Sequence, residues 1–358
     1  MHFEVTGRYK CGLNPSRHCQ QNYQQASKSR HPEPSALEFC MPFEREQMKL
    51  KATELAAKGV FIGTSSWKYE GWFNQLYTPA RYEYRGKVAT TRFERSCLAE
   101  YAEVFKTVCV DAAYYTFPSE KYLDGLVAQV PSDFQFGFKV TDEITVRKFP
   151  NLPRFGVRAG KPNENFLNAK LFSRAFLKPC EHIRANVGVV MFEFSRFHPS
   201  DYEHGRDFVA DLDKFFGNLP KGWPYAVEMR NKNWLAPEYF ACLSRHGITH
   251  VFNSWDAMPP VSKQMALPGS QTHPELVAAR FLLKPGRKYD DAVKTFQPYD
   301  QTKEVNEEAR KAGAQLIKEG SATGTKKKTL IFVNNRLEGN ALNTIAAMID
   351  LVTMDSIP

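Results

Sequence analysis

The sequence predicts a single (β/α)8 TIM barrel with an N-terminal extension. Two observations support this prediction: eight short apolar runs alternate with segments of helical periodicity, and polar or aromatic residues follow nearly every run. A chain of 358 residues has a length that α/β barrels commonly use for one domain. The expected strands are Gly59–Gly63, Thr107–Asp111, Phe134–Val140, Val187–Phe192, Tyr225–Met229, Ile248–Phe252, Val277–Leu282 and Thr329–Val333.

Helices are expected between these strands, because apolar residues recur there every three or four positions. Ser119 follows Pro118 and is a suitable N-cap for the helix after the second strand. Residues 141–165 contain several Pro and Gly residues and are too many for an ordinary barrel loop, which is typical of a lid or a binding loop. The other expected helices are Glu44–Lys58, Phe93–Val104, Phe166–Phe176, Phe208–Phe216, Glu238–Arg245, Thr302–Lys318 and Ala341–Thr353.

The first residues differ in composition from the rest of the chain. They are rich in Gln, Ser, Asn, Arg and Pro and show neither helical nor alternating periodicity. We therefore predict a flexible N-terminal extension over residues 1–45 and a barrel domain over residues 46–358. A nucleic-acid-binding arm is the functional alternative for the extension.

The composition favours a cytoplasmic protein with an anionic partner. A net charge of +9 and a pI near 9.1 suit an anionic small molecule or a nucleic acid. No apolar run approaches the ~20 residues of a membrane helix, and the N-terminus lacks a secretory pattern, so no membrane partner is expected. The seven cysteines include no C-x-x-C pair and fit reduced thiols.

Basic residues gather after two of the expected strands. Arg147–Lys161 contains five basic residues and no acidic one, and Lys284–Lys288 contains three. Barrel topology places both stretches on the C-terminal rim, where they would attract phosphate groups. As exposed side chains, they are expected to contribute little to stability.

Charged side chains at strand ends are candidate catalytic residues. Glu228 and Arg230 lie two positions apart and therefore point to the same side of their strand. A charge inside a barrel must be paired or solvated, so we expect Glu228 to form an ion pair with Arg230 or Arg280. The pair would orient a substrate or let Glu228 act as a general base; the alternative is a buried structural salt bridge. With Asp111 and Glu193, Glu228 supplies three carboxylates, which permits two-carboxylate acid/base chemistry.

Polar and aromatic side chains at the same strand ends are candidate substrate contacts. Aromatic rings can stack on sugars or nucleobases, or can instead plug the barrel mouth. We expect one cleft to contain Thr64, Trp67, Tyr115, Glu228, Arg230, Arg280 and Asn334. The predicted substrate-binding residues are Thr64, Ser65, Trp67, Tyr69, Tyr115, Arg280, Lys284, Asn334 and Asn335.

The sequence predicts no cofactor and assigns no metal ligands. His246 and His250 have H-x-x-x-H spacing, but Gly247 separates the expected helix from the next strand, so the two should not share a helix face. The remaining histidines fall mostly outside strand ends. An Mg²⁺ ion held by carboxylates remains an alternative, with Asp111, Glu193 and Glu228 as its ligands. Neither a P-loop nor a G-x-G-x-x-G motif is present.

Three motifs resemble those of one family. Residues 62–72 resemble I-G-T-S-x-W-x-Y-x-G-W, residues 226–234 resemble A-V-E-x-R-x-x-x-W, and residues 332–335 resemble F-x-N-N. Together they resemble the DUF72 family, also called the YecE-like proteins, over Gly59 to Leu351. The resemblance implies a TIM barrel of unestablished activity.

The chain departs from this family's pattern at three strand ends. The family's V-E-I-N-S-T reads V-C-V-D-A-A here, so Cys109 and Asp111 replace a Glu and an Asn. Glu193 stands where relatives often have Gln, and the family's R-L-H-G keeps Arg280 but loses its histidine. A mechanism that requires that histidine is therefore not expected in this chain.

These observations favour an enzyme that acts on a phosphorylated or nucleic-acid-like anionic substrate at the C-terminal barrel face. A hydrolase of the phosphodiesterase or nuclease type is the expected class, although the sequence leaves open whether the protein is catalytic. One alternative is a glycosidase- or isomerase-like carbohydrate enzyme that uses the paired carboxylates. The other is a barrel that binds nucleic acid without catalysis.

Overall fold

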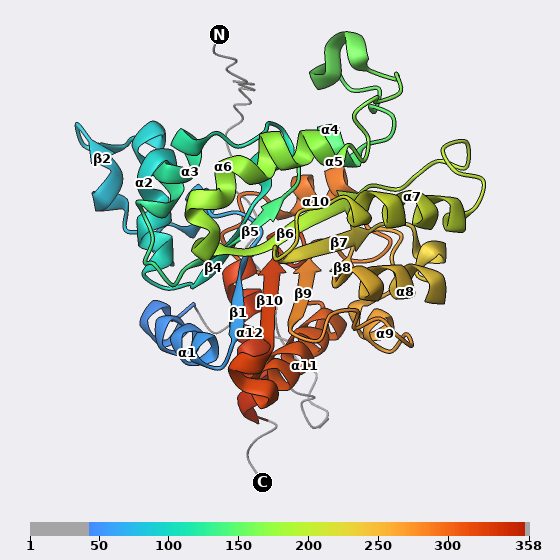
Figure 1. Ribbon diagram of the computed structural model, residues 1–358. Helices are drawn as coiled ribbons and strands as arrows, with labels where there is room; N and C mark the ends of the chain where they lie inside the picture. The colour runs from blue at the N-terminus through green and yellow to red at the C-terminus, as the bar shows by residue number, and fades with distance from the viewer. Residues whose placement is uncertain (1–42, 355–358) are drawn as a thin grey trace, which may run out of the picture. The chain divides into compact units, whose positions relative to one another are not determined.

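The computed structural model describes residues 43–354, which form a closed barrel of eight parallel strands surrounded by helices (Figure 1). The order around the barrel is β1-β10-β9-β8-β7-β6-β5-β4, and Thr64 of β1 pairs with Val108 of β4 to close it. The predicted fold class is confirmed, and each predicted run forms a barrel strand. The strands are β1 Val60–Thr64, β4 Thr107–Val110, β5 Gln135–Lys139, β6 Val187–Phe194, β7 Tyr225–Met229, β8 Thr249–Ser254, β9 Leu276–Phe281 and β10 Lys328–Val333; the hairpin strands β2 Glu83–Tyr84 and β3 Lys87–Val88 lie outside the barrel.

The predicted helices form with two adjustments, and α4, α9 and α10 were not predicted. The helix expected over Phe166–Phe176 contains a π-helical turn at Ser173–Leu177. The helix expected from Thr302 begins later, because the Asn306 side chain caps it by accepting from the Ala309 amide at 3.1 Å. The helices are α1 Arg45–Ala57, α2 Thr90–Ala102, α3 Glu120–Val127, α4 Asp142–Thr145, α5 Ala169–Phe172, α6 Lys178–Cys180, α7 Gly205–Gly217, α8 Pro237–His246, α9 Val261–Met265, α10 Tyr289–Phe296, α11 Glu307–Thr323 and α12 Ala341–Met354. Ser119 caps α3 as predicted, accepting from the Tyr122 amide at 3.2 Å.

The barrel interior changes from polar to apolar to charged along its axis. Near the N-terminal ends of the strands, Lys328 donates to Gln135 at 2.7 Å. The middle is filled by apolar side chains, and Phe332 occupies the space that Gly137 leaves: a Cβ at Gly137 would lie 2.5 Å from the Phe332 ring. Charged side chains at the opposite end of the barrel close its mouth and form the candidate site.

The long segment after β5 is an ordered excursion. It begins with α4, and an antiparallel bridge joins Lys148 to Pro162 across it. Val146, Phe149 and Phe155 form a small core of their own. Figure 1 shows this green segment standing off the barrel near the ends of the strand arrows. Its function as a lid or binding loop stays a prediction.

The predicted extension over residues 1–45 lies outside the described residues, apart from its last three positions. There, Phe43 stacks on Phe105 with ring centroids 6.4 Å apart, and Arg45 begins α1. Within residues 43–354, no helix combines the length and the apolar character needed to cross a membrane.

Candidate functional site

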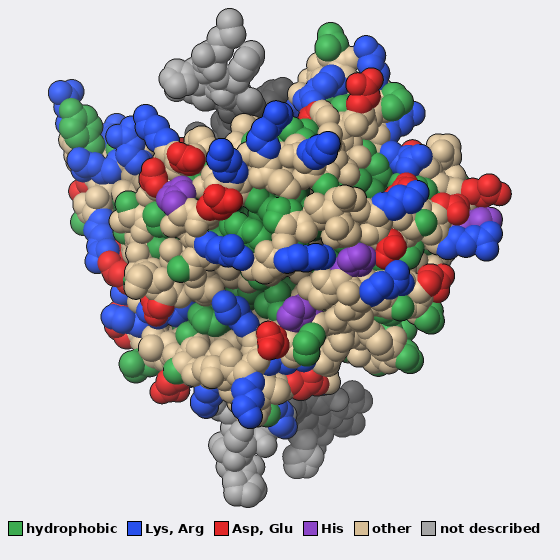
Figure 2. Space-filling model, viewed as in Figure 1, with side chains coloured by type: hydrophobic (Ala, Val, Ile, Leu, Met, Phe, Trp, Pro, Cys, Tyr) green, Lys and Arg blue, Asp and Glu red, His purple; other side chains and the backbone are tan. Residues whose placement is uncertain are grey.

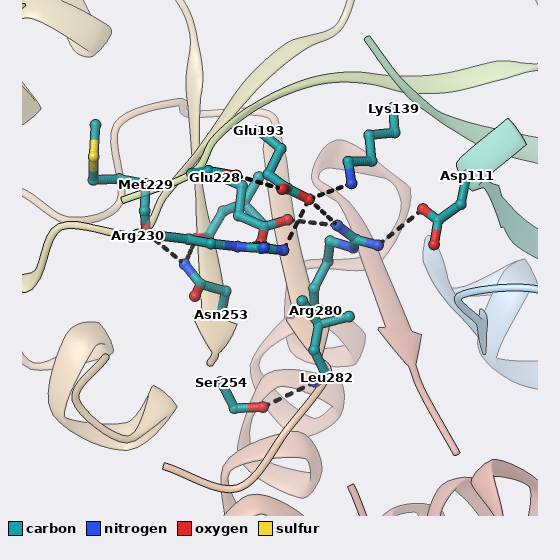
Figure 3. A network of polar contacts seen from close by, with 12 residues as sticks. Asp111, Lys139, Glu193, Glu228, Met229, Arg230, Asn253, Ser254, Arg280 and Leu282 are labelled. Atoms are coloured by element: carbon teal, nitrogen blue, oxygen red, sulfur yellow. Dashed lines mark hydrogen bonds and ion pairs between the residues drawn. The ribbon is translucent and has the colours of Figure 1, made fainter. Parts of the chain in front are cut away.

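Arg280 is the centre of a cluster of charged side chains at the C-terminal end of the barrel interior (Figure 3). Its guanidinium lies 2.6 Å from Glu228, 3.0 Å from Asp111 and 3.5 Å from Glu193. We use the term charge network for Asp111, Lys139, Glu193, Glu228, Arg230 and Arg280. Because it contains three acids and three bases, its formal charges cancel.

Two further cations complete the network. Arg230 lies 2.8 Å from both Glu193 and Glu228, and Lys139 lies 2.5 Å from Glu193. The predicted ion pairing of Glu228 is therefore confirmed with both Arg230 and Arg280. Lys139 was not predicted, although a single lysine within the apolar run Phe134–Val140 is a signal that could have indicated it.

The strand register explains why the cations are needed. Glu193 on β6 and Glu228 on β7 are direct neighbours, so two buried carboxylates lie side by side. Such a pair is stable only if cations neutralise it. Burial alone would raise the pKa of Glu193, but the charges of Arg230, Lys139 and Arg280 outweigh it and lower the pKa to about 2.

Backbone contacts and aromatic rings hold the network in place. Asn253 on β8 donates to the Met229 carbonyl at 3.0 Å, and Ser254 accepts from the Leu282 amide at 3.0 Å (Figure 3). The Arg230 guanidinium lies 3.7 Å from the Trp255 ring centroid, and Lys139 Nζ lies 3.6 Å from the centroid of Tyr114. These contacts restrict the rotamers of both cations.

The network is closed to solvent on most sides. Asp111 is its most accessible member, with 34% of its side chain exposed, and only its Oδ1 is bound by Arg280. Tyr115, at 62% exposure, and Arg154 lie near this opening, with the Arg154 guanidinium 5.0 Å from the Tyr115 ring. Two predicted site residues, Asp111 and Tyr115, therefore mark one edge of the mouth.

Two residues of the predicted cleft lie elsewhere. Thr64 faces the helical layer, where its hydroxyl lies 3.0 Å from that of Tyr101 on α2. Trp67 is 6% exposed and packs in the core between barrel and helices. The predicted convergence is thus wrong for these two. The closed barrel turns Thr64, the last side chain of β1, outward, and the apolar Trp67 ring is buried in the core.

Other predicted binding residues support loops. Asn334 accepts from the Arg336 amide at 3.0 Å, and Asn335 accepts from the Ala341 amide at 2.7 Å, so both shape the turn before α12. Tyr69 is half-buried against Tyr299, and burial raises its pKa to about 12. Ser65 is fully buried, and its hydroxyl has no hydrogen-bond partner within residues 43–354.

Several residues of the two basic stretches form ion pairs with acids. The ion pairs are Arg154–Asp142 at 3.1 Å, Arg158–Glu143 at 2.6 Å, Lys284–Glu304 at 2.6 Å, and Arg287–Glu304. Asp142 is buried, and burial raises its pKa against the opposing charge of Arg154. Because removal of Arg154 would leave a buried carboxylate unpaired, we now expect Arg154 to contribute to stability, unlike the other basic residues of these stretches.

Arg230 also lines a cavity of about 320 Å³ between the loops that follow β6 and β7. Arg196 and Lys232 line it too, are exposed, and have no ion pair among the described residues. Glu203 is its acidic lining residue. The sequence analysis did not identify Arg196 and Lys232, since neither stands at a specified position of a strand-end motif.

The walls of this cavity are fixed by contacts between the two loops. Phe197 and Trp234 stack with centroids 5.3 Å apart, and Asn231 accepts from the Phe197 amide at 3.0 Å. His198 lies on the cavity, and its Nδ1 is 2.8 Å from the Ser200 hydroxyl. Its Nε2 has no hydrogen-bond partner in the described part of the chain. Although the sequence placed most histidines away from strand ends, His198 follows β6 on the working face.

Comparison with known proteins gives the family. The sequence matches "Protein of unknown function DUF72" over residues 61–357. The chain belongs to the DUF72 family. The fold of this DUF72 protein is similar to that of a solved DUF72 family protein from Enterococcus faecalis V583, with 18% identity, a TM-score of 0.55, and coverage of 82% of this chain and 95% of that one. A DUF72 family protein from Thermotoga maritima MSB8 is similar at 20% identity and a TM-score of 0.51, covering 83% and 99%. No curated protein matches the chain.

Two of the three departures of this DUF72 protein from the motifs it resembles lie at the network. Asp111 and Glu193 are members of it, and the Cys109 thiol lies 3.5 Å from Asp111. Burial raises the pKa of Cys109, which is therefore not a reactive thiolate.

The three carboxylates do not form a favourable Mg²⁺ site. Glu193 and Glu228 already contact two or three cationic groups each. Because Mg²⁺ prefers carboxylate and water oxygens free of competing cations, this donor set does not suit it. The Mg²⁺ alternative therefore receives no support from the geometry.

A larger groove of about 1040 Å³ lies away from the mouth, between the α5–α6 segment and α7. It shares no lining residue with the charge network. In Figure 2, green apolar side chains with blue ones around them cover the middle of the face below the α5–α6 segment.

Proposed function

We propose that this DUF72 protein is an enzyme that acts on a small phosphate-bearing substrate in the cavity beside Arg230. The observation that carries the proposal is the clustering of Arg196, Arg230 and Lys232 around that cavity. Its volume of about 320 Å³ suits a small ligand, and its position at the C-terminal ends of barrel strands is where barrel enzymes bind substrates.

Arg230 is the proposed primary phosphate ligand. Its guanidinium is held by Glu193 and Glu228 from one side and by Trp255 from another, so it is positioned before substrate arrives. A planar guanidinium can bind two phosphate oxygens at once. Arg196 and Lys232 have exposed side chains that can close on the remaining oxygens.

His198 is the proposed proton-transfer residue. Ser200 orients its ring through Nδ1, which leaves Nε2 available to the cavity. Protonation of a leaving oxygen by a positioned histidine is general acid catalysis, and cations around a phosphate stabilise the charge that develops. Together these groups suit a hydrolase of the phosphodiesterase type.

The carbohydrate alternative has weaker support. A glycosidase needs one carboxylic acid that holds a proton near neutral pH. With a pKa of about 2, Glu193 cannot serve as that acid. Its pairing with three cations instead indicates a positioning residue for Arg230.

Thermal-shift titrations with inorganic phosphate, phosphosugars, nucleotides and short oligonucleotides test binding. We expect a phosphate-bearing compound to raise the melting temperature of the wild type and to do so less in Arg196→Ala/Lys232→Ala. The matched control is Lys148→Ala/Lys161→Ala, which removes the same number of positive charges from exposed side chains of the long segment after β5. Equal weakening in both double variants would mean that binding is diffuse, which favours the non-catalytic nucleic-acid reading.

Turnover is tested with a chromogenic phosphodiester. His198→Gln should lower kcat while the thermal shift by phosphate persists, because the proton-transfer group is removed and the cations remain. Binding without turnover by the wild type would contradict the enzyme proposal. No shift with any phosphate compound would contradict the substrate class.

A further inference from the structure

Three side chains on the helical layer offer metal-ligand atoms close together. Asp213 on α7 and Cys242 and His246 on α8 place one such atom each within 4.8 Å of the others. His246 Nε2 lies 2.9 Å from Asp213 Oδ1, and Cys242 Sγ lies 3.9 Å from the same oxygen. No other group of this kind with three or more members occurs within residues 43–354.

We propose that Asp213, Cys242 and His246 form a zinc site that joins α7 to α8. A thiolate, an imidazole and a carboxylate are a ligand set that favours Zn²⁺ over Mg²⁺ or Ca²⁺. In a tetrahedral zinc site such ligand atoms lie about 3.4–3.6 Å apart, as follows from the usual bond lengths. The separations of 2.9 Å and 3.9 Å given above differ from these values by amounts that small changes of side-chain rotamer can supply. A water molecule would be the fourth ligand.

Local helix geometry brings the ligands together. Cys242 and His246 are four residues apart on α8, so their side chains lie on the same face one turn apart. That face packs against α7, which presents Asp213. The pairing of His246 with His250 considered from the sequence does not form: His250 is buried, and its Nδ1 lies 3.2 Å from the Tyr239 hydroxyl.

A metal ion can reach the site from solvent. The side chain of Asp213 is 42% exposed and that of His246 is 14% exposed, whereas Cys242 is buried beneath them. Zinc binding would displace the thiol proton of Cys242 to solvent and would replace the hydrogen bond between His246 and Asp213. The exposed Arg245, 2.8 Å from Asp213 Oδ1, can move to the other carboxylate oxygen.

The site is expected to stabilise the fold. Both α7 and α8 run back from the C-terminal ends of strands, so Asp213 and His246, near the ends of these helices, lie toward the opposite face of the barrel. Residues at that face of a barrel generally serve stability rather than catalysis. A metal that binds only the folded chain raises its melting temperature. Loss of the site should therefore leave phosphate binding at the Arg230 cavity unchanged.

Cobalt substitution of the reduced, full-length protein tests the site. We expect one Co²⁺ per chain beyond any bound by the first 42 residues, with a thiolate-to-cobalt charge-transfer band that Zn²⁺ abolishes. Cys242→Ser should remove this band and the zinc-dependent rise in melting temperature. The matched control, Cys180→Ser, replaces another buried thiol and should keep both. The variant Cys11→Ser/Cys19→Ser/Cys40→Ser should also keep them.

A second variant covers the case in which Cys242→Ser does not fold. Asp213→Asn changes a partly exposed side chain and should weaken Co²⁺ binding while the folded spectrum in the absence of metal persists. Absence of the charge-transfer band in the wild type would overturn the proposal. A band that survives in Cys242→Ser, or that disappears only with the N-terminal cysteines, would overturn it too, and the trio would then be a hydrogen-bonded link between helices.

Discussion

Replacing Arg280 by methionine should destabilise the protein by about 3–5 kcal/mol, the usual cost of removing one partner from a buried ion pair. Arg280 is 2% exposed and contacts three carboxylates at 2.6, 3.0 and 3.5 Å. Its removal leaves three acids with only Lys139 and Arg230 in the barrel mouth. Domains of this kind are stable by roughly 5–15 kcal/mol, so the loss should be large but compatible with folding.

A double-mutant cycle separates charge balance from packing. In Glu228→Gln/Arg280→Met, two acids and two bases remain, so the double variant should be less destabilised than the sum of the single variants by about 0.5–3 kcal/mol. The control is Lys284→Met, which breaks a 2.6 Å pair with Glu304 whose side chains are 47% and 32% exposed. That change should cost below about 1 kcal/mol.

Urea unfolding followed by circular dichroism and tryptophan fluorescence measures these differences, provided that the slopes of the transitions agree. A loss below about 1 kcal/mol in Arg280→Met would refute the reasoning, since this is what an exposed pair costs. Strict additivity in the double variant would also refute it, because the two side chains would then act independently.

Three further predictions concern acid sensitivity and packing. The pKa of Glu193 is about 2 in the folded protein and 4.5 ordinarily, so the stability that its charge contributes is lost as the pH falls from 4.5 towards 2. In Glu193→Gln, the urea midpoint should therefore fall less over that pH range than it does in the wild type. Burial lowers the pKa of His250 to about 3 from 6.5, so the unfolded chain takes up its proton first and stability falls below pH 6.5; His250→Gln should flatten this part of the same profile. Gly137→Ala should lower the free energy of unfolding by about 1–3 kcal/mol, because the new Cβ would lie 2.5 Å from the Phe332 ring. The control Gly125→Ala on α3 places a Cβ with no atom within 4 Å and should not destabilise the protein. Equal urea midpoints for the two variants would contradict this account.

The sequence was sufficient for the barrel and for most of the charge network. Each strand is an apolar run of the right length, and parallel strands in a closed barrel must end on one face. Asp111, Glu193, Glu228 and Arg280 stand at such ends, so barrel topology places all four on the same face. The alternation of side chains along a strand likewise requires Glu228 and Arg230 to point the same way.

Only the tertiary structure determined which way the side chains at the strand ends point and how accessible they are to solvent. Thr64 and Ser65 are adjacent at the end of β1, and only the closed barrel determines that Thr64 contacts the helical layer. Asp142 forms an ion pair with Arg154 of the first basic stretch, because the folded loop brings the two side chains together. No local sequence pattern shows that two such residues are close in space.

Of the residues that line the proposed substrate cavity, the sequence identified one, and the others required the tertiary structure. Arg230 could be singled out from its motif, but Arg196, His198 and Lys232 lie in two loops whose conformation depends on the stack of Phe197 on Trp234. Strand positions follow from a period of two residues that is visible in the sequence. Loop positions are set by contacts between distant segments, so only the folded chain determines which side chains share a cavity.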